Sequence, residues 1–292
     1  NMCHESSGVA LTSTIGIAKG SVTLDDIHRA KLLVIVGQNP GTNHPRMLSA
    51  LERAKKAGAR ILAVNPLPEA GLLRFRNPQR VDGLVAGGTA LADRFLQIRV
   101  GGDLALFQAI GALLIEWRAV DAPFLDAHTT GYPEYEASLR TLDWAAVAAA
   151  TGLTREECEA AARMFADSPA TIVCWAMGLT QHKHAVITIQ YLVNLMLLKG
   201  NIGKPGAGLC PVRGHSNVQG DRTMGITENP PYVRFQETGP AGIEVELLKA
   251  FANSLNADIK WIKGSEETIL TLLKNSEIDI AAGGFNHTSV WK

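Results

Sequence analysis

A polar run punctuated by glycines occupies residues 211–222 and carries side chains suited to binding a polar ligand. Its donors, which include one permanent positive charge, are Arg213, His215, Asn217 and Gln219. The glycines between them would let the backbone approach a bound molecule closely. A solvated surface loop is the alternative, but such a loop would rarely collect amide and guanidinium groups without Lys or Glu. We therefore expect this segment to surround something polar.

A second pair that could do chemistry, Cys3 and His4, stands near the first residue. A thiolate can act as a nucleophile or as a ligand for a soft metal, and the neighbouring imidazole can accept a proton. The pair alone is weak evidence, and by itself it favours an inert cysteine over a functional one. Cys158, Cys174 and Cys210 are widely spaced, which favours a reducing compartment and argues against structural zinc. Because no basic leader or apolar signal core opens the chain, we expect it to be cut from a longer sequence.

Composition describes a soluble globular protein. The chain has 292 residues, of which 46% are hydrophobic and 19% charged, enough for one large or two ordinary domains. The formal net charge is zero, so nothing indicates a nucleic-acid or membrane partner, and an anionic ligand would need a local site. The longest apolar run, residues 187–198, is interrupted by Gln190 and Asn194 and predicts a buried helix.

The elements that would position these residues alternate between strands and helices. Apolar runs at 32–36 and 61–64 flank a helical pattern at 46–57, which predicts a βαβ unit of a parallel sheet. Polar loops follow both runs, at the sheet edge where open α/β folds bind ligands, and the helix amino terminus near Pro45 could receive phosphate. The first loop lacks the spacing of an ordinary nicotinamide site or a nucleoside-triphosphate loop.

Further strand and helix signals extend this pattern. Helices are predicted at 104–119 with Asp103 as N-cap, at 143–151, and at 154–167, where Thr154 opens a capping box. A buried strand at 171–175 runs into a second polar loop, 176–184. Its three basic residues indicate a solvated helix start more than a metal site, because no carboxylate or Cys accompanies them: His182, Lys183 and His184.

Six segments in this order resemble the alpha subunit of formate-dehydrogenase-like molybdopterin oxidoreductases. They are residues 1–8, 37–45, 65–69, 175–181, 200–203 and 211–225. The resemblance implies that residues 1–228 are a truncated central α/β region with Rossmann-like open parallel sheets and helices on both faces. It implies a cytoplasmic enzyme in which molybdenum or tungsten is held by two pterin guanine dinucleotides and one protein Cys. The expected reaction is two-electron oxidation of a small anionic substrate such as formate, with an unknown electron acceptor.

The resemblance also assigns roles to individual residues. Cys3 would be the metal-ligating thiolate and His4 the neighbouring proton acceptor, with Arg213 and His215 at the substrate. One guanine dinucleotide would be held by Gly37, Gln38, Asn39, Thr42, His44, Asn65, Pro66, Gly101, Gly102 and Asp103. The pterins would be contacted by Met177, Gly178, Gln181, Gly214, Asn217 and Gln219. His215 stands where formate-specific members carry Gln, and Asn65 where Asp is usual; both departures bear on the substrate more than on the cofactor.

Two parts of that family have no counterpart in the sequence. Family members begin with an iron-sulfur-cluster domain and end with a domain that closes over the second dinucleotide. We therefore expect this chain by itself to hold the cofactor poorly and not to catalyse the oxidation.

Residues 229–292 resemble a different family. Their order of strand, turn, helix, strand, helix and strand is similar to the first lobe of a polar-amino-acid-type periplasmic solute-binding protein. The resemblance implies ligand contacts from Gly284, Phe285 and Thr288. An amino-acid-binding module of a transport system is therefore the alternative to the enzyme. The boundary between the two resemblances lies near residues 227–231. A chimeric sequence explains this boundary more simply than a natural fusion does. The order of strands and helices after it argues against a divergent final part of the oxidoreductase.

Overall fold

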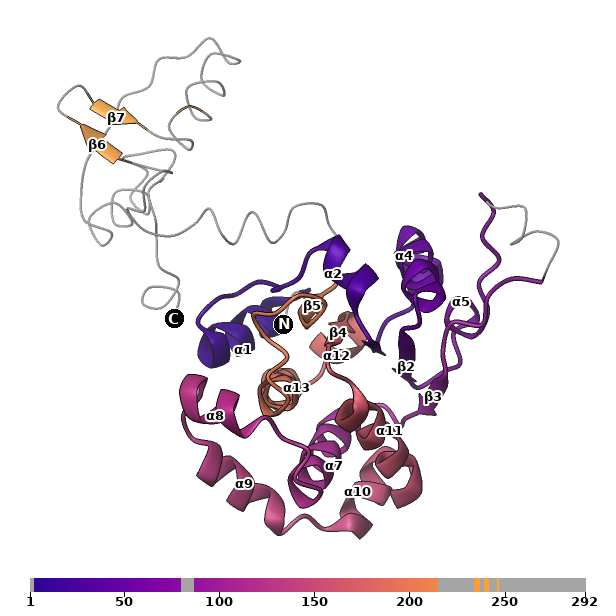
Figure 1. The fold of residues 1–292 in the computed structure, drawn as a ribbon, viewed down its shortest axis with the longest axis vertical. Helices are drawn as coiled ribbons and strands as arrows, with labels where there is room; N and C mark the ends of the chain where they lie inside the picture. The colour runs from indigo at the N-terminus through magenta and orange to yellow at the C-terminus, as the bar shows by residue number, and fades with distance from the viewer. Residues whose placement is uncertain (1–2, 80–86, 215–233, 237–238, 242–245, 247–292) are drawn as a thin grey trace. The chain divides into compact units, whose positions relative to one another are not determined.

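The computed structural model describes residues 3–79, 87–214, 234–236, 239–241 and 246 (Figure 1). The chain divides into two compact units, Asn1–Ser216 and Asn217–Lys292. In the second unit, β6 (Arg234–Gln236) pairs antiparallel with β7 (Gly239–Ala241). The helices of the first unit are α1 (Glu5–Ile15), α2 (Leu24–Arg29), α3 (Pro40–Asn43), α4 (Pro45–Lys56), α5 (Ala70–Leu73), α7 (Asp103–Glu116), α8 (Ala122–His128), α9 (Tyr132–Arg140), α10 (Trp144–Thr151), α11 (Arg155–Asp167), α12 (Met177–Thr180) and α13 (Ala185–Leu198).

A five-stranded parallel sheet organises the first unit. Its order is β3-β2-β1-β4-β5, and the strands are β1 (Leu32–Val36), β2 (Arg60–Asn65), β3 (Arg94–Gln97), β4 (Thr171–Trp175) and β5 (Gly208–Pro211). β1 pairs with β2 on one side and with β4 on the other, so the strand order reverses direction between β1 and β4. In open α/β sheets this reversal creates a crevice at the carboxyl ends of the strands.

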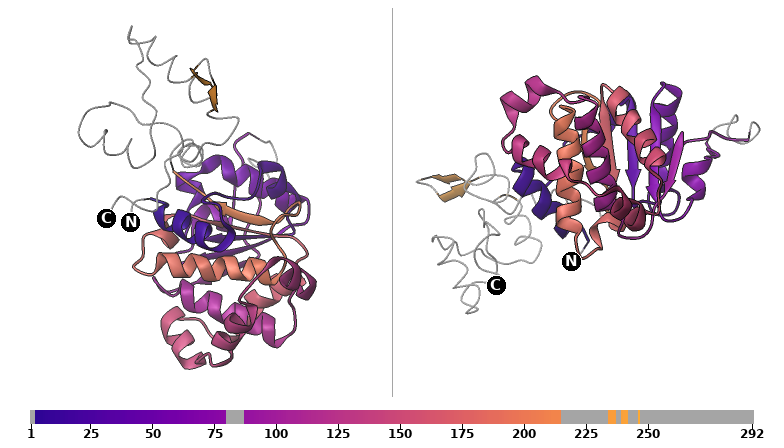
Figure 2. Two further views of the ribbon diagram at one scale, coloured as in Figure 1. Left: turned by 90° about the vertical axis from the view of Figure 1, so that its left-hand side faces the viewer. Right: turned by 90° about the horizontal axis from the view of Figure 1, so that it is seen from below.

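Helices cover both faces of this sheet, as Figure 2 shows and as the sequence predicts. Side chains alternate along β1: Leu32 and Val34 pack in the same core as the apolar side chains of α7 and α13, whereas Leu33 and Ile35 pack with Leu51 of α4. Because both faces are buried, every residue of β1 is buried. That double burial is why the strand reads as an uninterrupted apolar run.

Local sequence signals fix several helix boundaries. The predicted capping box is confirmed: Thr154 Oγ1 accepts from the Glu157 amide at 3.2 Å, and Glu157 accepts from the Thr154 amide at 2.8 Å. The prediction of Asp103 as an N-cap is wrong. Gly102 occupies the cap and Asp103 is already the first helical residue, so its carboxylate bonds its own backbone N–H.

The apolar run at 187–198 lies within α13, most of whose residues are buried, as predicted. Within the part of the chain that the structure describes, no helix combines the length and apolarity needed to span a bilayer.

Candidate functional site

A pocket of about 960 Å³ lies where the carboxyl ends of β1, β2, β4 and β5 converge. Its floor depends on a close approach between the loops after β1 and β4. A Cβ added to Gly178 would lie 2.5 Å from Gly37 Cα, and the Gly178 amide donates to Gly37 O at 3.0 Å. Both positions therefore need glycine, and together they set the distance between the two sides of the crevice.

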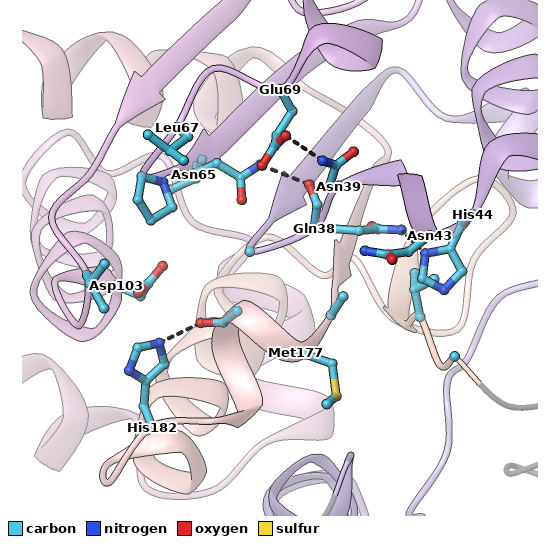
Figure 3. A pocket seen from close by; sticks show the side chains of 18 of the residues that line it. Gln38, Asn39, Asn43, His44, Asn65, Leu67, Glu69, Asp103, Met177 and His182 are labelled. Carbon is cyan, nitrogen blue, oxygen red and sulfur yellow. Dashed lines mark hydrogen bonds between the residues drawn. The ribbon is translucent and has the colours of Figure 1, made fainter. Parts of the chain in front are cut away.

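Many of the residues expected at a cofactor line this pocket (Figure 3). They are Cys3, Gly37, Gln38, Asn39, His44, Asn65, Pro66, Asp103, Met177, Gly178 and Gly214. They come from segments far apart in the sequence, and the parallel sheet brings them together. The lining also includes residues that the sequence does not predict at the site, which are Asn43, Val64, Leu67, Glu69, Val100, Ala176, His182 and Val212.

Other expected residues do not line the pocket but support residues that do. Thr42 donates its amide to Asn39 Oδ1 at 3.1 Å, and Gln181 donates to the carbonyl of Cys3 at 3.1 Å. Gly101 and Gly102 precede α7, and a Cβ on Gly102 would lie 2.7 Å from the carbonyl oxygen of Ala150. Six predicted residues lie outside the described part of the chain: His215, Asn217, Gln219, Gly284, Phe285 and Thr288.

Amide side chains hold the loop after β1 in place. Asn65, at the end of β2, is 3% exposed and donates to the carbonyl of Gln38 at 2.9 Å. Asn39 caps α3 and donates to the carboxylate of Glu69. An aspartate at 65 would have no N–H to give to that carbonyl. The hydrogen bond to the Gln38 carbonyl therefore explains why position 65 carries Asn instead of Asp.

Gln38 and His44 form the next part of the wall. His44 Nε2 donates to the carbonyl of Arg213 at 3.2 Å, which leaves Nδ1 of the neutral ring to accept from Gln38 Nε2 at 3.4 Å. Gln38 is 2% exposed, and its Oε1 has no hydrogen-bond partner among the described residues. A buried acceptor without a donor is costly, so this oxygen suits a ligand that brings an N–H or O–H group.

Cys3 reaches the pocket with unusual backbone geometry. Its φ is 46°, in the left-handed region that a side chain with a Cβ rarely adopts, and its carbonyl is held by Gln181. Such strain persists only where surrounding contacts enforce it, and it is concentrated at functional sites. Cys3 is partly exposed and its sulfur is a free thiol.

The His4 ring points into the protein, where it is 1% exposed. Nε2 must donate to the carbonyl of Val212, 2.9 Å away, since a carbonyl oxygen only accepts. Ser7 Oγ accepts from Trp175 Nε1 at 2.9 Å and lies 3.0 Å from His4 Nδ1. In the neutral ring, Nδ1 is therefore the acceptor of the Ser7 hydroxyl. This chain of bonds ties the start of α1 to the ends of β4 and β5.

The opposite wall carries a titratable acid. Asp103 is 7% exposed at the first position of α7, and burial raises its pKa from 3.8 to about 6. The nearby charge of His182 acts in the lowering direction. In Figure 3, Asp103 and His182 lie across from Asn43 and His44, and His182 Nε2 donates to the carbonyl of Gly178 at 2.6 Å. The pocket thus offers the buried Asp103 carboxylate on one wall, and amides with the Glu69 carboxylate on the other.

Arg213 follows β5 and directs Nη2 to the carbonyl of Ala18 at 3.2 Å, so its guanidinium is not part of the pocket wall. In the described ranges, no three or more His, Cys, Asp or Glu side chains gather into a group that could hold a metal ion. Among the described residues of the wall, Cys3 is the one cysteine.

Comparison with known proteins shows what this arrangement is similar to. An uncharacterized oxidoreductase of Mycobacterium tuberculosis is 57% identical over 237 residues, which cover 79% of this chain and 30% of the relative. Formate dehydrogenase H of Escherichia coli is 31% identical over 222 residues, 76% of this chain and 29% of that enzyme. The likeness to formate-dehydrogenase-like oxidoreductases is confirmed. This chain spans about 30% of the length of these relatives.

A solved structure supports the fold independently of sequence identity. Acetylene hydratase from Pelobacter acetylenicus superposes with a TM-score of 0.58 at 21% identity, covering 70% of this chain and 25% of that one. The predicted α/β class is confirmed. Residues 223–290 match a different family, the bacterial extracellular solute-binding proteins of family 3, which confirms the second resemblance.

Proposed function

We propose that residues 1–228 form the cofactor-binding α/β region of a cytoplasmic molybdopterin oxidoreductase that oxidises a small anion such as formate. The observation that supports this most directly is the composition of the pocket. It is lined by Cys3 together with residues from the ends of β1, β2 and β4 that the resemblance assigns to the cofactor. Its volume of about 960 Å³ lies in the range of cofactor sites.

The chemistry of the walls fits a pterin guanine dinucleotide. The Watson–Crick edge of guanine presents two adjacent donors, N1–H and N2–H, which an ionised carboxylate can accept together. Asp103 is the buried carboxylate of the wall, and with a pKa of about 6 it is mostly ionised at neutral pH. Gln38 Oε1 adds a buried acceptor for a further N–H or O–H group. These groups select for hydrogen-bonding edges of a flat heterocycle.

The bound molybdenum or tungsten would supply the two-electron chemistry, and this chain would supply its thiolate ligand and the proton acceptor. Cys3 is the sulfur of the pocket wall, and a soft thiolate suits a sulfur-coordinated metal. His4 can take a proton at Nδ1 once the Ser7 hydroxyl turns away. Arg213 would orient the anion after releasing Ala18, since a guanidinium pairs well with a carboxylate. We further predict that His215 lies at the substrate, and that Asn217 and Gln219 contact the pterins.

Nucleotide binding to the purified chain tests the cofactor site. Guanosine diphosphate is expected to bind and to raise the melting temperature, whereas adenosine diphosphate at equal concentration is not, because its base edge offers a different pattern of donors. Asp103→Asn should lose most of the preference for guanine, and Asp126→Asn on the exposed side of α8 is the matched control. Equal binding of the two nucleotides, or none of either, contradicts the proposed site.

A second candidate function rests on the family match at residues 223–290. We propose that residues 229–292 form a solute-binding segment for polar amino acids, with Gly284, Phe285 and Thr288 at the ligand. A panel of polar amino acids tested by isothermal titration calorimetry checks this. A saturable heat of binding with one amino acid supports this candidate, provided that Asp103→Asn, which alters the pocket of the first unit, leaves it unchanged. The absence of a saturable heat with every amino acid of the panel argues against it.

A further inference from the structure

Two free thiols stand opposite each other on neighbouring strands. Cys174 of β4 and Cys210 of β5 are direct partners in the parallel register. Paired strands lie about 4.8 Å apart, inside the range of roughly 4.4–6.8 Å between Cα atoms that a disulfide spans. Both side chains face the core that contains Leu33 and Ile35. The separation of the two Cα atoms therefore suits a disulfide, and a small approach of the two strands would bring the Cβ atoms within the roughly 3.5–4.5 Å that the bond requires.

The two residues differ in exposure. Cys174 is fully buried, whereas Cys210 is partly exposed on β5, the edge strand of the sheet. They also differ in acidity. The Cys174 thiol donates a hydrogen bond to the sulfur of Cys210, which lowers the pKa of Cys210 and raises the pKa of Cys174 well above its ordinary value. A partly exposed residue whose sulfur favours the thiolate thus lies beside a fully buried thiol that keeps its proton.

We propose that Cys174 and Cys210 form a peroxide-sensitive dithiol pair that closes into a disulfide between β4 and β5. The Cys210 thiolate attacks one oxygen of hydrogen peroxide, breaking the O–O bond; Cys210 becomes a sulfenic acid and hydroxide leaves. The sulfur of Cys174 then attacks the Cys210 sulfur, forming the S–S bond, and the departing hydroxyl takes the thiol proton as water. The peroxide is reduced to two molecules of water in all, and two thiols are oxidised.

The other cysteines lack this arrangement. Cys158 is fully buried in α11, and burial raises its pKa to about 11. Cys3 lines the pocket just before α1. It is not part of a strand, so no cysteine faces it across the sheet. Selective oxidation should therefore begin at Cys210 and end at Cys174. Cys3 can be oxidised independently, but to a sulfenic or higher acid.

The pair is placed to affect the pocket, and this goes beyond the proposed function. β4 leads within two residues to Ala176 and Met177 of the lining, and β5 leads within two residues to Val212. A covalent link between Cys174 and Cys210 would fix the two strands just before they enter the crevice. The site would then respond to oxidation whether or not the pocket holds a pterin.

Peptide mapping of the full chain tests the proposal. The protein is treated with a small excess of hydrogen peroxide, alkylated with a maleimide after denaturation, digested and analysed by mass spectrometry. We expect a linked peptide pair containing Cys174 and Cys210, two hydrogens lighter than the reduced pair, and an alkylated Cys158. Recovery of Cys174 and Cys210 as free thiols under conditions that oxidise Cys3, or a link from either to another cysteine, overturns the proposal.

Variants separate the two steps. In Cys174→Ala the Cys210 sulfenic acid should persist and be trapped by dimedone, and Cys210→Ala should leave Cys174 unoxidised. Cys174→Ser keeps a hydroxyl donor, so iodoacetamide should alkylate Cys210 several-fold faster in Cys174→Ser than in Cys174→Ala. Cys158→Ala is the control and should still form the disulfide. Peptide mapping of the wild-type protein decides the proposal by itself. The test therefore remains valid even if one of the variants does not fold.

Discussion

At the scale of single residues, Asp103 is a carboxylate held out of water at the wall of the pocket. Burial raises its pKa from 3.8 to about 6, so the folded state binds a proton more tightly than the unfolded chain does. The resulting cost to stability is absent below pH 3.8 and complete above about pH 6. A residue kept in such a position at a cost indicates a role in binding.

Replacing Asp103 with Asn should remove this pH dependence. The shift in pKa corresponds to about 3 kcal/mol, so Asp103→Asn should gain up to that amount relative to wild type between pH 4 and pH 7. Urea unfolding at both pH values measures the difference. Asp126→Asn, on the exposed surface of α8, should stay within about 0.5 kcal/mol at both. An equal effect of Asp103→Asn at the two pH values would show that the carboxyl group is not desolvated.

Some residues of the pocket wall can be predicted from the sequence, and others cannot. Cys3, Gln38 and Asn65 stand in segments with a distinctive composition, and the structure brings them to one pocket. Glu69 and Val212 also lie in such segments, but the sequence does not single them out as residues of the wall. Their place in the wall follows from the hydrogen bond of Glu69 to Asn39 and from the pairing of β5 with β4, which only the folded chain provides.

At the scale of elements, the contact between Gly37 and Gly178 fixes the crevice. The atoms nearest to a Cβ on Gly178 are the Cα, carbonyl oxygen and carbonyl carbon of Gly37, at 2.5, 2.6 and 2.9 Å. Backbone atoms cannot rotate away as a flexible side chain would. The loops after β1 and β4 would have to separate to make room.

Gly178→Ala is therefore expected to destabilise the first unit by about 1–3 kcal/mol through overpacking. It should also weaken binding of guanosine diphosphate, because the wall that carries Gln38 would move. Chemical denaturation and a binding titration measure the two effects. Gly214→Ala is the matched control for stability, since a Cβ there meets nothing within 4 Å. If the two variants were equally stable, the close contact would not constrain the loops.

Elements differ in how well the sequence predicts them. β1, β2 and β4 are buried on both faces, so each appears as a continuous apolar run. The sequence does not predict β3 or β5. β3 has exposed residues at both of its ends, and β5 has only four residues, including Gly208 at a φ of 145° and Pro211. Their neighbours in the sheet impose the extended conformation, which no local signal reveals.

At the scale of the whole molecule, two units with different relatives share one chain. The first, Asn1–Ser216, has an extensive core on both faces of its sheet, whereas the shorter unit, Asn217–Lys292, overlaps the match to extracellular solute-binding proteins. Stability rises with the fraction of surface that a fold buries, and that fraction is smaller for short chains. We therefore expect the shorter unit to be the less stable one.

Calorimetric melting of the full chain should accordingly show two transitions, with the larger enthalpy at the higher temperature, because unfolding enthalpy grows with the number of residues. A ligand that binds one native unit stabilises that unit alone, by about 2.7 kcal/mol when its concentration is a hundred times its dissociation constant. Guanosine diphosphate should therefore raise the upper transition and leave the lower one in place, and a polar amino acid should do the reverse. A single transition that both ligands shift would mean that the units unfold together. A nucleotide that raised only the lower transition would move the cofactor site away from the crevice between β1 and β4.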